Sequence, residues 1–450
     1  MSKPSIPRGT RDFGPKIMAK RKYILNTIEK VYQSFGFMPL ETPSMENLST
    51  LTGKYGAEGD QLLFKILNSG DYLKDINSDK FDSKSLTPLI SEKGLRYDLT
   101  VPLARYVVMN QNEVTFPFKR YQMQPVWRAD RPQKGRYREF WQCDADVLGT
   151  NSLLCEADFI KIYRQVFSKL GLNDFEIRIN HRKLLEAVVE KADVSVHFKT
   201  ITIIIDKADK IGMDGVKNEL IALGLNDVQS TIILSLLNKQ AFNAANLEAI
   251  QHALPDTENA KKAMSDLNQL LNLLDQKTDF VYLDGSLARG LDYYTGCILE
   301  VVPTSVQMGS ISGGGRYDDL TGIFGLKGIS GIGISFGIDR IYDVMEELNL
   351  FPTDGTNFTD VLFCCMDESA FAYSLPLADE LRLNGIKTEV YPDTSKLKKQ
   401  LDYANAKNIL WAVIVGENEM KNNQLALKNL LTGEQELIDK MALTVFFQKL

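Results

Sequence analysis

One stretch of the sequence, residues 127–146, gathers the side chains best suited to hold a polyphosphate. Around a turn that contains glycine it carries Arg128, Arg131, Lys134, Arg136 and Arg138. Each arginine presents a planar fork of N–H donors that binds phosphate or carboxylate oxygens in pairs, so several of them predict a polyphosphate clamp. Charges in a turn are also typical of an exposed hairpin with cross-strand ion pairs. The apolar, strand-like segments 118–128 and 139–149 on either side favour the clamp.

A second candidate is the segment RYDLT, residues 96–100, which precedes the apolar stretch VPLARYVV. The side-chain oxygens of Asp98 and Thr100 could accept hydrogen bonds from a substrate ammonium group. Aspartate and threonine are equally favoured as caps of a helix, and the apolar stretch could form one. The segment alone does not decide between a ligand site and a helix cap.

Two tyrosines and an arginine in ARGLDYYTG, residues 288–296, suggest a ring-lined pocket around one buried charge. We expect this segment to belong to a strand that continues to residue 302. Neighbouring strand residues face opposite sides, so at most one of Tyr293 and Tyr294 should line such a pocket directly. A core tyrosine with a satisfied hydroxyl is the alternative interpretation and the more common situation.

Two glycine-rich segments, 312–319 and 331–340, invite comparison with nucleotide-binding loops. Neither contains the phosphate-loop pattern G-x-x-x-x-G-K-[ST], and GIGISFG does not fit G-x-G-x-x-G. We expect instead that the glycines let a strand lie close beneath a ligand. Arg340, at the start of the helix that follows, should then point back at that ligand.

The elements that must hold these residues change in character along the chain. Helical periodicity covers residues 17–35 and, in a form rich in glutamine, asparagine and leucine, about residues 182–278. We interpret the second region as an inserted helical module. After residue 350 strands and helices alternate, which predicts a small α/β unit with its own core.

The composition is that of an ordinary folded protein and limits the partners. The 450 residues suffice for two or three domains, and 44% of them are apolar and 24% charged. No apolar run approaches the roughly 18 residues that span a membrane, and the first residues lack a secretory h-region. A net charge of −6 argues against a general nucleic-acid coat but leaves room for a local basic surface.

The cysteine and histidine content points to the cytoplasm. Five cysteines, an odd number, lie mostly in apolar runs and are expected to be reduced and buried. The chain has no CxxC pair and only three histidines, so we expect no zinc site.

Taken together, the candidate segments closely resemble those of the histidyl-tRNA synthetases, a family of class IIa aminoacyl-tRNA synthetases. FGFMPLETPSME is similar to motif 1, with Pro43 at its dimer-interface proline; VWRADRPQKGRYREFWQCDAD is similar to motif 2, and GIGISFGIDRI to motif 3. ARGLDYYTG and SGGGRYDD are similar to two segments peculiar to the histidine enzymes. The opening PRGTRDFGP also resembles the family, so the resemblance covers essentially the whole chain.

The resemblance implies a fold and a division of the chain. It implies an α+β catalytic domain with a mostly antiparallel sheet, a helical insertion and a C-terminal α/β domain that binds the anticodon. The catalytic domain would consist of residues 1–181 and 279–350, the insertion of 182–278 and the anticodon-binding domain of 357–450. Motif 1 implies a homodimer.

The resemblance also implies roles for individual residues, with Arg128 and Arg289 as the catalytic pair on the ATP α-phosphate. The residues implied for histidine binding are Asp98, Thr100, Arg128, Gln142, Asp146, Arg289, Tyr293 and Tyr294. Those implied for ATP binding are Arg128, Asp130, Arg136, Phe140 and Arg340. The candidates for tRNA contacts are Gln133, Lys134, Lys396, Lys398 and Lys399. A solvated helix face is an equally good interpretation of the last three.

The activity implied is ligation of L-histidine to its tRNA. ATP, accompanied by Mg²⁺, would give histidyl-adenylate and pyrophosphate, and the histidyl group would pass to the 3′-terminal adenosine of the tRNA. No metal ion is expected to be fixed by the protein alone. The alternative is a noncatalytic regulatory subunit of histidine biosynthesis, a kind of chain that typically loses the motif 2 arginines or the C-terminal domain. A synthetase for another amino acid is opposed by ARGLDYYTG and SGGGRYDD.

The resemblance is mixed in one respect. RYDLT has the form found in archaeal and eukaryotic members, whereas the motif 2 loop RPQKGRYREF resembles bacterial ones. The sequence therefore leaves the lineage open.

Overall fold

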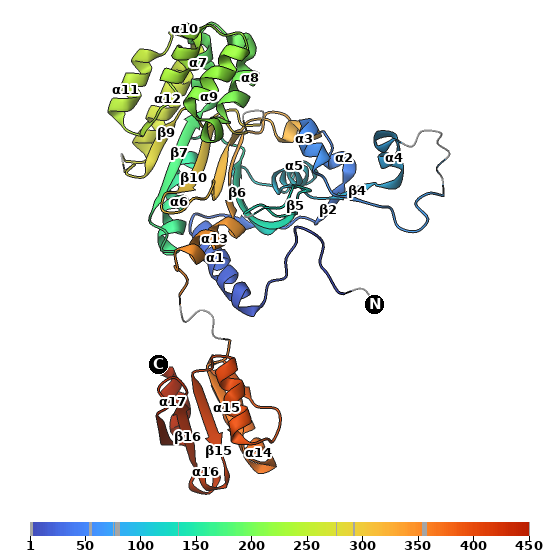
Figure 1. The fold of residues 1–450 in the computed structure, drawn as a ribbon, viewed down its shortest axis with the longest axis vertical. Helices are drawn as coiled ribbons and strands as arrows, with labels where there is room; N and C mark the ends of the chain where they lie inside the picture. Colours follow the sequence, from blue (N-terminus) through green and yellow to red (C-terminus); the bar gives the residue numbers. More distant parts are fainter. Residues whose placement is uncertain are drawn as a thin grey trace. The chain divides into compact units, whose positions relative to one another are not determined.

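The computed structural model describes residues 3–53, 56–74, 76, 82–133, 135–275, 277–290, 293–352 and 358–449. The chain forms two compact units, Met1–Phe351 and Pro352–Leu450, each with its own hydrophobic core (Figure 1). The larger unit contains all the candidates for histidine and ATP binding, and the smaller one contains the three candidate lysines.

The larger unit is organised by a nine-stranded sheet. Its order is β1 (Met38–Pro39), β5 (Phe118–Trp127), β6 (Glu139–Leu148), β12 (Gly331–Gly337), β11 (Ser312–Tyr317), β10 (Cys297–Pro303), β7 (Phe175–His181), β9 (Val281–Asp284) and β8 (Lys239–Ala241). Neighbouring strands are antiparallel except β1 with β5 and β7 with β9, which are parallel. The mostly antiparallel sheet that the resemblance implies is therefore confirmed.

The two faces of this sheet differ because successive strand residues point to opposite sides. On β6, Cys143, Ala145 and Val147 are buried in the main hydrophobic core. The helices that cover this apolar face are α1 (Pro15–Ser34), α6 (Leu154–Lys169) and α13 (Ile338–Glu347). The residues between the apolar ones, among them Asp144 and Asp146, face the other side. We call that side the polar face, and the candidate residues gather there.

Residues 182–278 are mainly helical, as their pattern predicts, and they pack in two places. A separate core joins α7 (Arg182–Lys191), α8 (Phe198–Ile205), α9 (Ala208–Ala222) and α10 (Asp227–Ser235), and the short η1 (Ser195–His197) links α7 to α8 without buried residues of its own. In contrast, α11 (Ala244–Ala253) and α12 (Glu258–Leu273) bury apolar residues in the main core. The strand β8 was not expected in this region; it pairs with β9 at the sheet edge, a position set by long-range pairing and not by a local pattern.

A small three-stranded sheet lies next to the polar face, in the order β2 (Met45–Asn47), β4 (Lys93–Leu95) and β3 (Lys65–Ile66). The short helices of this region are α2 (Leu48–Leu51), α3 (Gly56–Gln61), α4 (Ser83–Ile90), α5 (Thr100–Met109) and η2 (Thr321–Phe324). Pro43 lies between β1 and β2 and belongs to neither strand. It therefore shapes the link between the two sheets and not a strand.

The smaller unit has a sheet that mixes parallel and antiparallel pairs. Its order is β14 (Thr388–Val390), β13 (Val361–Cys365), β15 (Trp411–Val415), β16 (Gln424–Asn429) and β17 (Gln435–Asp439), and the last two strands are antiparallel. Its helices are α14 (Glu368–Leu383), α15 (Leu397–Ala406), α16 (Glu417–Asn422), η4 (Lys440–Ala442) and α17 (Leu443–Gln448). The predicted α/β alternation is confirmed as far as β15, while β16 and β17 were not anticipated.

All five cysteines lie in described segments, and they are buried and form no disulfide, as expected. Burial raises the pKa of every one of these thiols, so they remain protonated and pack as small apolar side chains. Among the residues described, no helix has the length and the apolar character needed to cross a membrane.

Candidate active site

Three carboxylates on the polar face influence one another, and we call them the acidic cluster: Asp98, Asp144 and Asp146. Buried groups hold Asp146 in place. Nη2 of the fully buried Arg120 lies 2.7 Å from its Oδ2, and the hydroxyl of Tyr317 donates to its Oδ1 at 2.5 Å. The antiparallel register of β5 and β6 places Arg120 directly opposite Asp146.

The acidic cluster contains more acid than base and therefore suits a cation. Burial raises the pKa of the Asp144 carboxyl to about 7, and the Arg120 guanidinium opposes this shift. The neighbouring carboxylates of Asp146 and Asp98 raise it further. Burial also raises the pKa of Asp146, again against Arg120. A cation bound here would favour the ionised forms of all three carboxyl groups.

Two buried acceptor atoms beside the cluster are available to a ligand. Oδ1 of Asp144 and Oε1 of Gln142 have no hydrogen-bond partner within the described part of the chain. The amide nitrogen of Gln142 donates to Oγ of Ser335 at 3.0 Å, which fixes the side chain and leaves its oxygen free. A buried acceptor without a donor is costly, so these two atoms favour a polar ligand.

The structure shows one of the two uses considered for segment 96–100, the helix cap, and places its carboxylate near Asp144. Oδ1 of Asp98 accepts a hydrogen bond from the backbone N–H of Val101 at 3.1 Å, in the first turn of α5, which begins at Thr100. The same carboxylate raises the pKa of Asp144 and so belongs to the acidic cluster as well. One carboxylate oxygen caps the helix, and the group still contributes charge to the site.

Tyr293 and Tyr294 both lie near the acidic cluster, and the strand assignment behind the expectation that at most one of them would line a pocket was wrong. The reason is that β10 begins only at Cys297, so strand alternation does not apply to these two residues. Their rings form an edge-to-face pair with centroids 5.2 Å apart. Burial raises the pKa of both phenols, and the nearby charges of Asp98 and Asp146 raise it further.

The glycines of β11 and β12 make room for the protein's own side chains. A Cβ at Gly333 would overlap Oδ1 of Asp146, and a Cβ at Gly315 would lie 2.7 Å from Cδ1 of Tyr294. Both glycines therefore let groups of the candidate histidine site lie directly against the sheet.

Four arginines gather at the other end of the polar face, and we call them the arginine group: Arg128, Arg136, Arg289 and Arg340. Arg340 lies among the others. Burial lowers the pKa of its guanidinium, and the charges of the other three lower it further. Like charges this close repel one another, so the group favours an anion between them.

Backbone carbonyls orient two members of the arginine group. Nε of Arg128 donates to the carbonyl of Tyr97 at 3.1 Å, and its Cζ lies 4.3 and 5.2 Å from the ring centroids of Tyr97 and Phe140. Nε and Nη1 of Arg340 donate to the carbonyls of Gly135 and Ser310, at 3.1 and 2.5 Å. A neutral acceptor fixes the direction of a guanidinium without cancelling its charge, which stays available to a phosphate.

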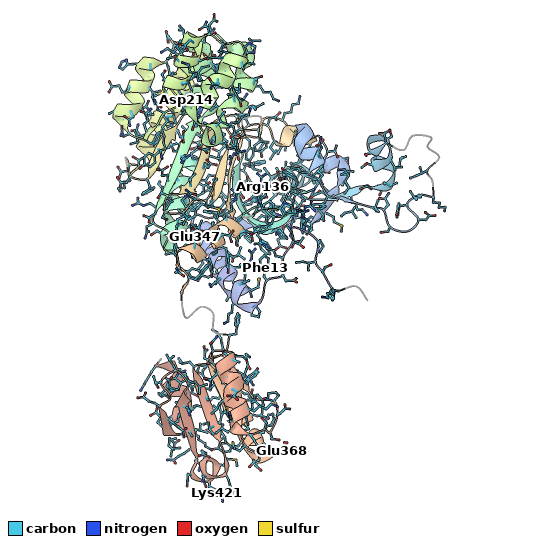
Figure 2. All side chains as sticks on the ribbon, in the orientation of Figure 1. Phe13, Arg136, Asp214, Glu347, Glu368 and Lys421 are labelled. Atoms are coloured by element: carbon cyan, nitrogen blue, oxygen red, sulfur yellow. The ribbon has the colours of Figure 1, made fainter. Side chains whose placement is uncertain are left out.

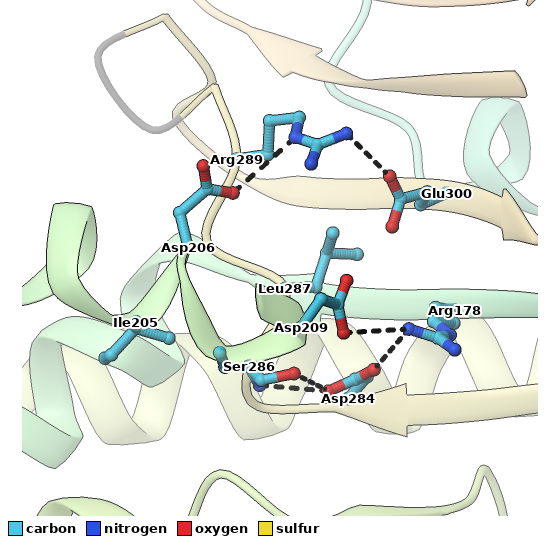
Figure 3. A pocket seen from close by; sticks show the side chains of 10 residues that line it. Arg178, Ile205, Asp206, Asp209, Asp284, Ser286, Leu287, Arg289 and Glu300 are labelled. Atoms are coloured by element: carbon cyan, nitrogen blue, oxygen red, sulfur yellow. Dashed lines mark hydrogen bonds and ion pairs between the residues drawn. The ribbon is translucent and has the colours of Figure 1, made fainter. Parts of the chain in front are cut away.

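Arg289 is held by two carboxylates instead (Figure 3). Its Nε lies 3.5 Å from Oδ1 of Asp206, just after α8, and its Nη1 lies 3.3 Å from Oε1 of Glu300 on β10. Burial raises the pKa of the Glu300 carboxyl, and Arg289 counteracts this shift. The Arg289 side chain is 60% exposed, so a ligand can reach it.

The turn between β5 and β6 presents two of its remaining candidates, Gln133 and Arg136, to solvent. Arg136 is exposed, with Nη1 3.7 Å from Oδ1 of Asp130. Gln133 is also exposed, and its backbone exchanges hydrogen bonds with that of Arg136 in both directions. Phe140, at the start of β6, is half-buried. Lys134 lies outside the described residues.

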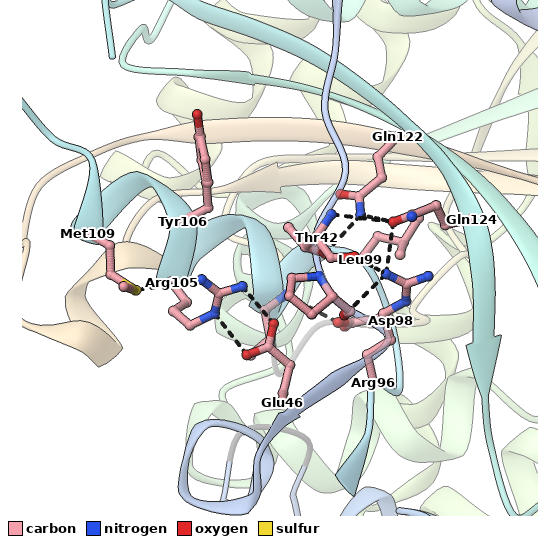
Figure 4. A network of polar contacts seen from close by, with 12 residues as sticks. Thr42, Glu46, Arg96, Asp98, Leu99, Arg105, Tyr106, Met109, Gln122 and Gln124 are labelled. Atoms are coloured by element: carbon pink, nitrogen blue, oxygen red, sulfur yellow. Dashed lines mark hydrogen bonds and ion pairs between the residues drawn. The ribbon is translucent and has the colours of Figure 1, made fainter. Parts of the chain in front are cut away.

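A second buried network supports the segment that carries Asp98 (Figure 4). The fully buried Arg96 donates to Oε1 of Gln124 at 2.8 Å and to the carbonyl of Thr42 at 2.6 Å. Gln122 donates to the hydroxyl of Thr42 and to Gln124, at 2.9 and 2.6 Å. Burial lowers the pKa of Arg96 to about 10. These bonds connect the motif 1 segment, β5 and residues 96–100.

Sequence reasoning missed three charged residues that shape the site, Arg120, Glu300 and Asp206, and gave no separate role to Asp144. A signal existed for Asp144, which alternates with Gln142 and Asp146 on one strand and so must share their face. No local signal identifies the others, because Arg120 depends on the register of β5 and β6, and Glu300 and Asp206 depend on packing between distant segments.

The three candidate lysines of the smaller unit are exposed. Lys396 precedes α15, and Lys398 and Lys399 lie in its first turn. This position is compatible both with RNA contacts and with a solvated helix face.

The chain matches two family models. That of the histidyl-tRNA synthetases matches residues 89–341, and that of the anticodon binding domain matches residues 360–450. The chain is 52% identical to a histidine–tRNA ligase of Cytophaga hutchinsonii and 51% identical to one of Porphyromonas gingivalis. These alignments cover 97% and 99% of both chains, respectively. A crystal structure of histidyl-tRNA synthetase from Nostoc sp. PCC 7120 is similar over 100% of both chains, with a TM-score of 0.85 and 30% identity.

Proposed function

The chain belongs to the histidyl-tRNA synthetase family, and we propose that the polar face of its nine-stranded sheet carries out the ligase reaction in two steps. The chain is a histidine–tRNA ligase, as its close relatives are. One observation supports this use of the polar face above all: an acid-rich cluster and four arginines lie on the same face. An amino acid and a nucleoside triphosphate that react with each other need these two charge environments side by side.

We propose that the acidic cluster binds the ammonium group of histidine. Asp98 and Asp146 supply the charge, and the hydroxyl of Thr100 adds an acceptor. The free oxygen of Gln142 and the tyrosine pair 293–294 surround the imidazole. A site built from polar groups that match a ligand rejects analogues without matching groups by factors on the order of 10⁴.

We propose that the arginine group binds ATP, with Mg²⁺ arriving on the phosphate oxygens as part of this substrate. Arg128 contacts the α-phosphate and the histidine carboxylate, Arg289 the α-phosphate and Arg340 the γ-phosphate. Phe140 stacks on the adenine ring. Arg136 contacts the β- and γ-phosphates, and Asp130 belongs to the same ATP-binding turn. Arg128 and Arg340 support this assignment, because backbone carbonyls hold them and do not neutralise their charge.

The first step needs no general base, because the histidine carboxylate is already ionised at pH 7. A carboxylate oxygen bonds to the α-phosphorus while the bond to the bridging oxygen breaks and pyrophosphate leaves. Arg128 and Arg289 stabilise the negative charge that grows on the α-phosphate oxygens. In the second step the 3′-hydroxyl of the terminal adenosine of the tRNA attacks the carbonyl of the adenylate, and AMP leaves.

We further propose how the chain meets its macromolecular partners. The smaller unit binds the anticodon region of the tRNA, with Lys396, Lys398 and Lys399 on phosphates, and Gln133 faces the end of the tRNA. Two copies form a homodimer through residues 35–46, in which Met38 and Met45 are each 53% exposed. The protein works in the cytoplasm, where its thiols stay reduced. Sedimentation at micromolar concentration tests the dimer, and a fully active monomer would contradict it.

ATP–pyrophosphate exchange with each of the standard amino acids tests the proposed function. Exchange with histidine alone is the expected result. Exchange with another amino acid would reassign the pocket, and no exchange with any would favour the regulatory-subunit alternative. The alternative has less support, because Arg128, Arg289, Arg340 and the smaller unit are all present.

A further inference from the structure

Residues 7–13, which lead into α1, lie against the turn that joins β5 to β6, and we call them the N-terminal strap. The turn, residues 128–138, carries three of the proposed ATP contacts: Arg128, Asp130 and Arg136. Nothing in the proposed reaction uses the strap. Its contacts with the turn and with α13 indicate a role in positioning the turn.

The strap completes the hydrogen bonding at the base of the turn. The backbone N–H of Arg138 donates to the carbonyl of Gly9 at 2.9 Å, while its carbonyl accepts from the N–H of Arg128 at 3.0 Å. The strap is thus hydrogen-bonded to the β5–β6 pair at Arg138, the residue that pairs with Arg128 just after the end of β5. The strap has its own internal turn, in which the N–H and the hydroxyl of Thr10 both donate to the carbonyl of Pro7, at 3.2 and 2.7 Å.

Two constraints make Gly9 necessary in this arrangement. Its φ of +88° lies in the left-handed region, which glycine adopts without strain. A Cβ at this position would also lie 2.8 Å from Cγ of Arg138 and 2.9 Å from Cγ of Pro132. The backbone of the strap therefore approaches the turn more closely than any other residue type would permit.

Arg11 connects the turn to α13. Its Cζ lies 3.2 Å from the ring centroid of Tyr137 in the turn, and its Nη2 forms an ion pair with Asp339. Asp339 is buried, is the second residue of α13 and directly precedes Arg340. Asp339 also accepts a hydrogen bond from a backbone N–H of β6.

The end of the strap is anchored to α1. The ring of Phe13 (labelled in Figure 2) contacts two guanidinium groups, with its centroid 4.9 Å from Cζ of Arg11 and 4.1 Å from Cζ of Arg21. Arg21 belongs to α1 and donates to Asp339 at 2.5 Å. The strap and α1 thus meet at one buried carboxylate of α13, and the turn is joined to it through the contact of Tyr137 with Arg11.

We propose that the N-terminal strap is a positioning element for ATP. It holds the turn 128–138 at a fixed place relative to α13, so that the motif 2 arginines and Arg340 of motif 3 face the same phosphates. This inference rests on the proposed ATP-binding role of these arginines. A turn released from the strap would sample more conformations, and ATP would have to order it on binding, which weakens ATP affinity.

The test is ATP–pyrophosphate exchange, with the KM for ATP and the KM for histidine measured separately. For Arg11→Ala and Tyr137→Ala we expect the KM for ATP to rise roughly 3- to 30-fold, the range that a lost cation–π contact implies. The KM for histidine should stay within about twofold, because no contact of the strap reaches the acidic cluster among the described residues. Arg11→Lys, which keeps the charge but not the planar fork, should give an intermediate value.

Two variants in the same stretch serve as matched controls. Arg8→Ala removes an exposed arginine three residues from Arg11, and Gly14→Ala adds a Cβ that meets no atom within 4 Å. Both should leave the KM for ATP unchanged, whereas Gly9→Ala should raise it. The double variant Arg11→Ala/Tyr137→Ala should be no worse than Arg11→Ala alone, because the contact through which Tyr137 acts is already lost when Arg11 is absent.

The outcomes separate this inference from the proposed function. Absence of exchange in the wild-type protein overturns the proposed function and the inference with it. Normal exchange in the wild type, with strap variants that match the controls, overturns the inference alone. A lower melting temperature with an unchanged KM for ATP also overturns it, because the strap would then only support the fold. If Gly9→Ala fails to fold, Arg11→Lys and Tyr137→Ala still give the decisive KM values.

Discussion

The acidic cluster and the arginine group occupy the same face of one sheet but are held in opposite ways. Asp146 is buried, and its partners Arg120 and Tyr317 are also buried and lie 2.7 and 2.5 Å away. In the arginine group, Arg289 is 60% exposed and its carboxylate partners lie 3.3 and 3.5 Å away. Two other arginines are held by backbone carbonyls.

This difference matches the two proposed ligands. An ammonium group is small and carries one charge, so a closed, rigid cluster can recognise it. A triphosphate is large and highly charged, so its site keeps several cations accessible and only lightly neutralised. Substitutions in the acidic cluster should therefore affect folding and binding together, whereas those in the arginine group should affect the reaction more than the fold.

The largest effect is expected for Asp146→Asn. This change leaves the Arg120 guanidinium buried without its counter-charge, and breaking a buried pair in this way typically costs about 3–5 kcal/mol. Urea denaturation should show this loss in the free energy of unfolding, together with weaker histidine binding. A variant that loses histidine binding but keeps wild-type stability would contradict the contrast between the acidic cluster and the arginine group.

Arg289→Ala should slow adenylate formation by a factor of about 10² to 10³, the usual effect of losing one preorganised donor. Arg289→Lys should also be strongly impaired, because an ammonium does not reproduce the planar fork. Pre-steady-state adenylation measures the rate, and the melting temperature should change little because the side chain is largely exposed. The matched control is Asp206→Asn, which removes an ion-pair partner and keeps the arginine. If both variants lose the same stability and Arg289→Ala keeps its rate, Arg289 is only structural.

Asp144 should make stability depend on pH. Its pKa of about 7 in the folded state lies above the value of about 3.9 for an unfolded aspartate, so the folded state binds the proton more tightly. Its stabilising contribution is then complete below about pH 4 and is lost as the pH rises towards 7, by at most about 1.4 kcal/mol per pH unit.

Urea denaturation of the wild type and Asp144→Asn at several pH values measures this effect. The difference in unfolding free energy between the two should shift against the wild type as the pH rises from 5 to about 7. The charged groups around Asp144 are Arg120 on β5, Asp146 on β6 and Asp98 before α5, and they are common to both proteins. A difference independent of pH would mean that Asp144 is not protonated in this range.

The smallest effect is expected for Asp130→Asn. Asp130 lies 3.7 Å from Arg136, which is 52% exposed, and such surface pairs contribute less than about 1 kcal/mol. Thermal unfolding should therefore be nearly unchanged. A loss of stability as large as that of Asp146→Asn would show that charged pairs contribute equally to the fold in the acidic cluster and around the arginine group.

The segments of the site could be predicted because their signals are local. The arms β5 and β6 appear as apolar strand patterns around a polar turn, and the helix after GIGISFG begins where expected, at Ile338. What joins these segments could not be predicted. Arg120 reaches Asp146 only because β5 and β6 pair in one particular register, and a register is a property of two strands together.

The errors have the same physical origin. Residues 293–296 have the aromatic composition of a strand, yet β10 begins at Cys297, where pairing with β7 begins. The helices of residues 182–278 share one periodicity, yet α12 packs in the main core and α8 in a separate one. Periodicity identifies an element, but contacts between distant segments decide which partner it meets.

The alternation along β6 also restricts the lengths that this chain can have. Inserting or deleting a single residue within β6, between Glu139 and Gln142, would turn the rest of the strand over, so that its two faces exchange. Cys143, Ala145 and Val147 would then face the substrates, and two carboxylates would enter the apolar core. Viable length variation in this part of the chain is therefore confined to the turns, and the strands can change only in composition.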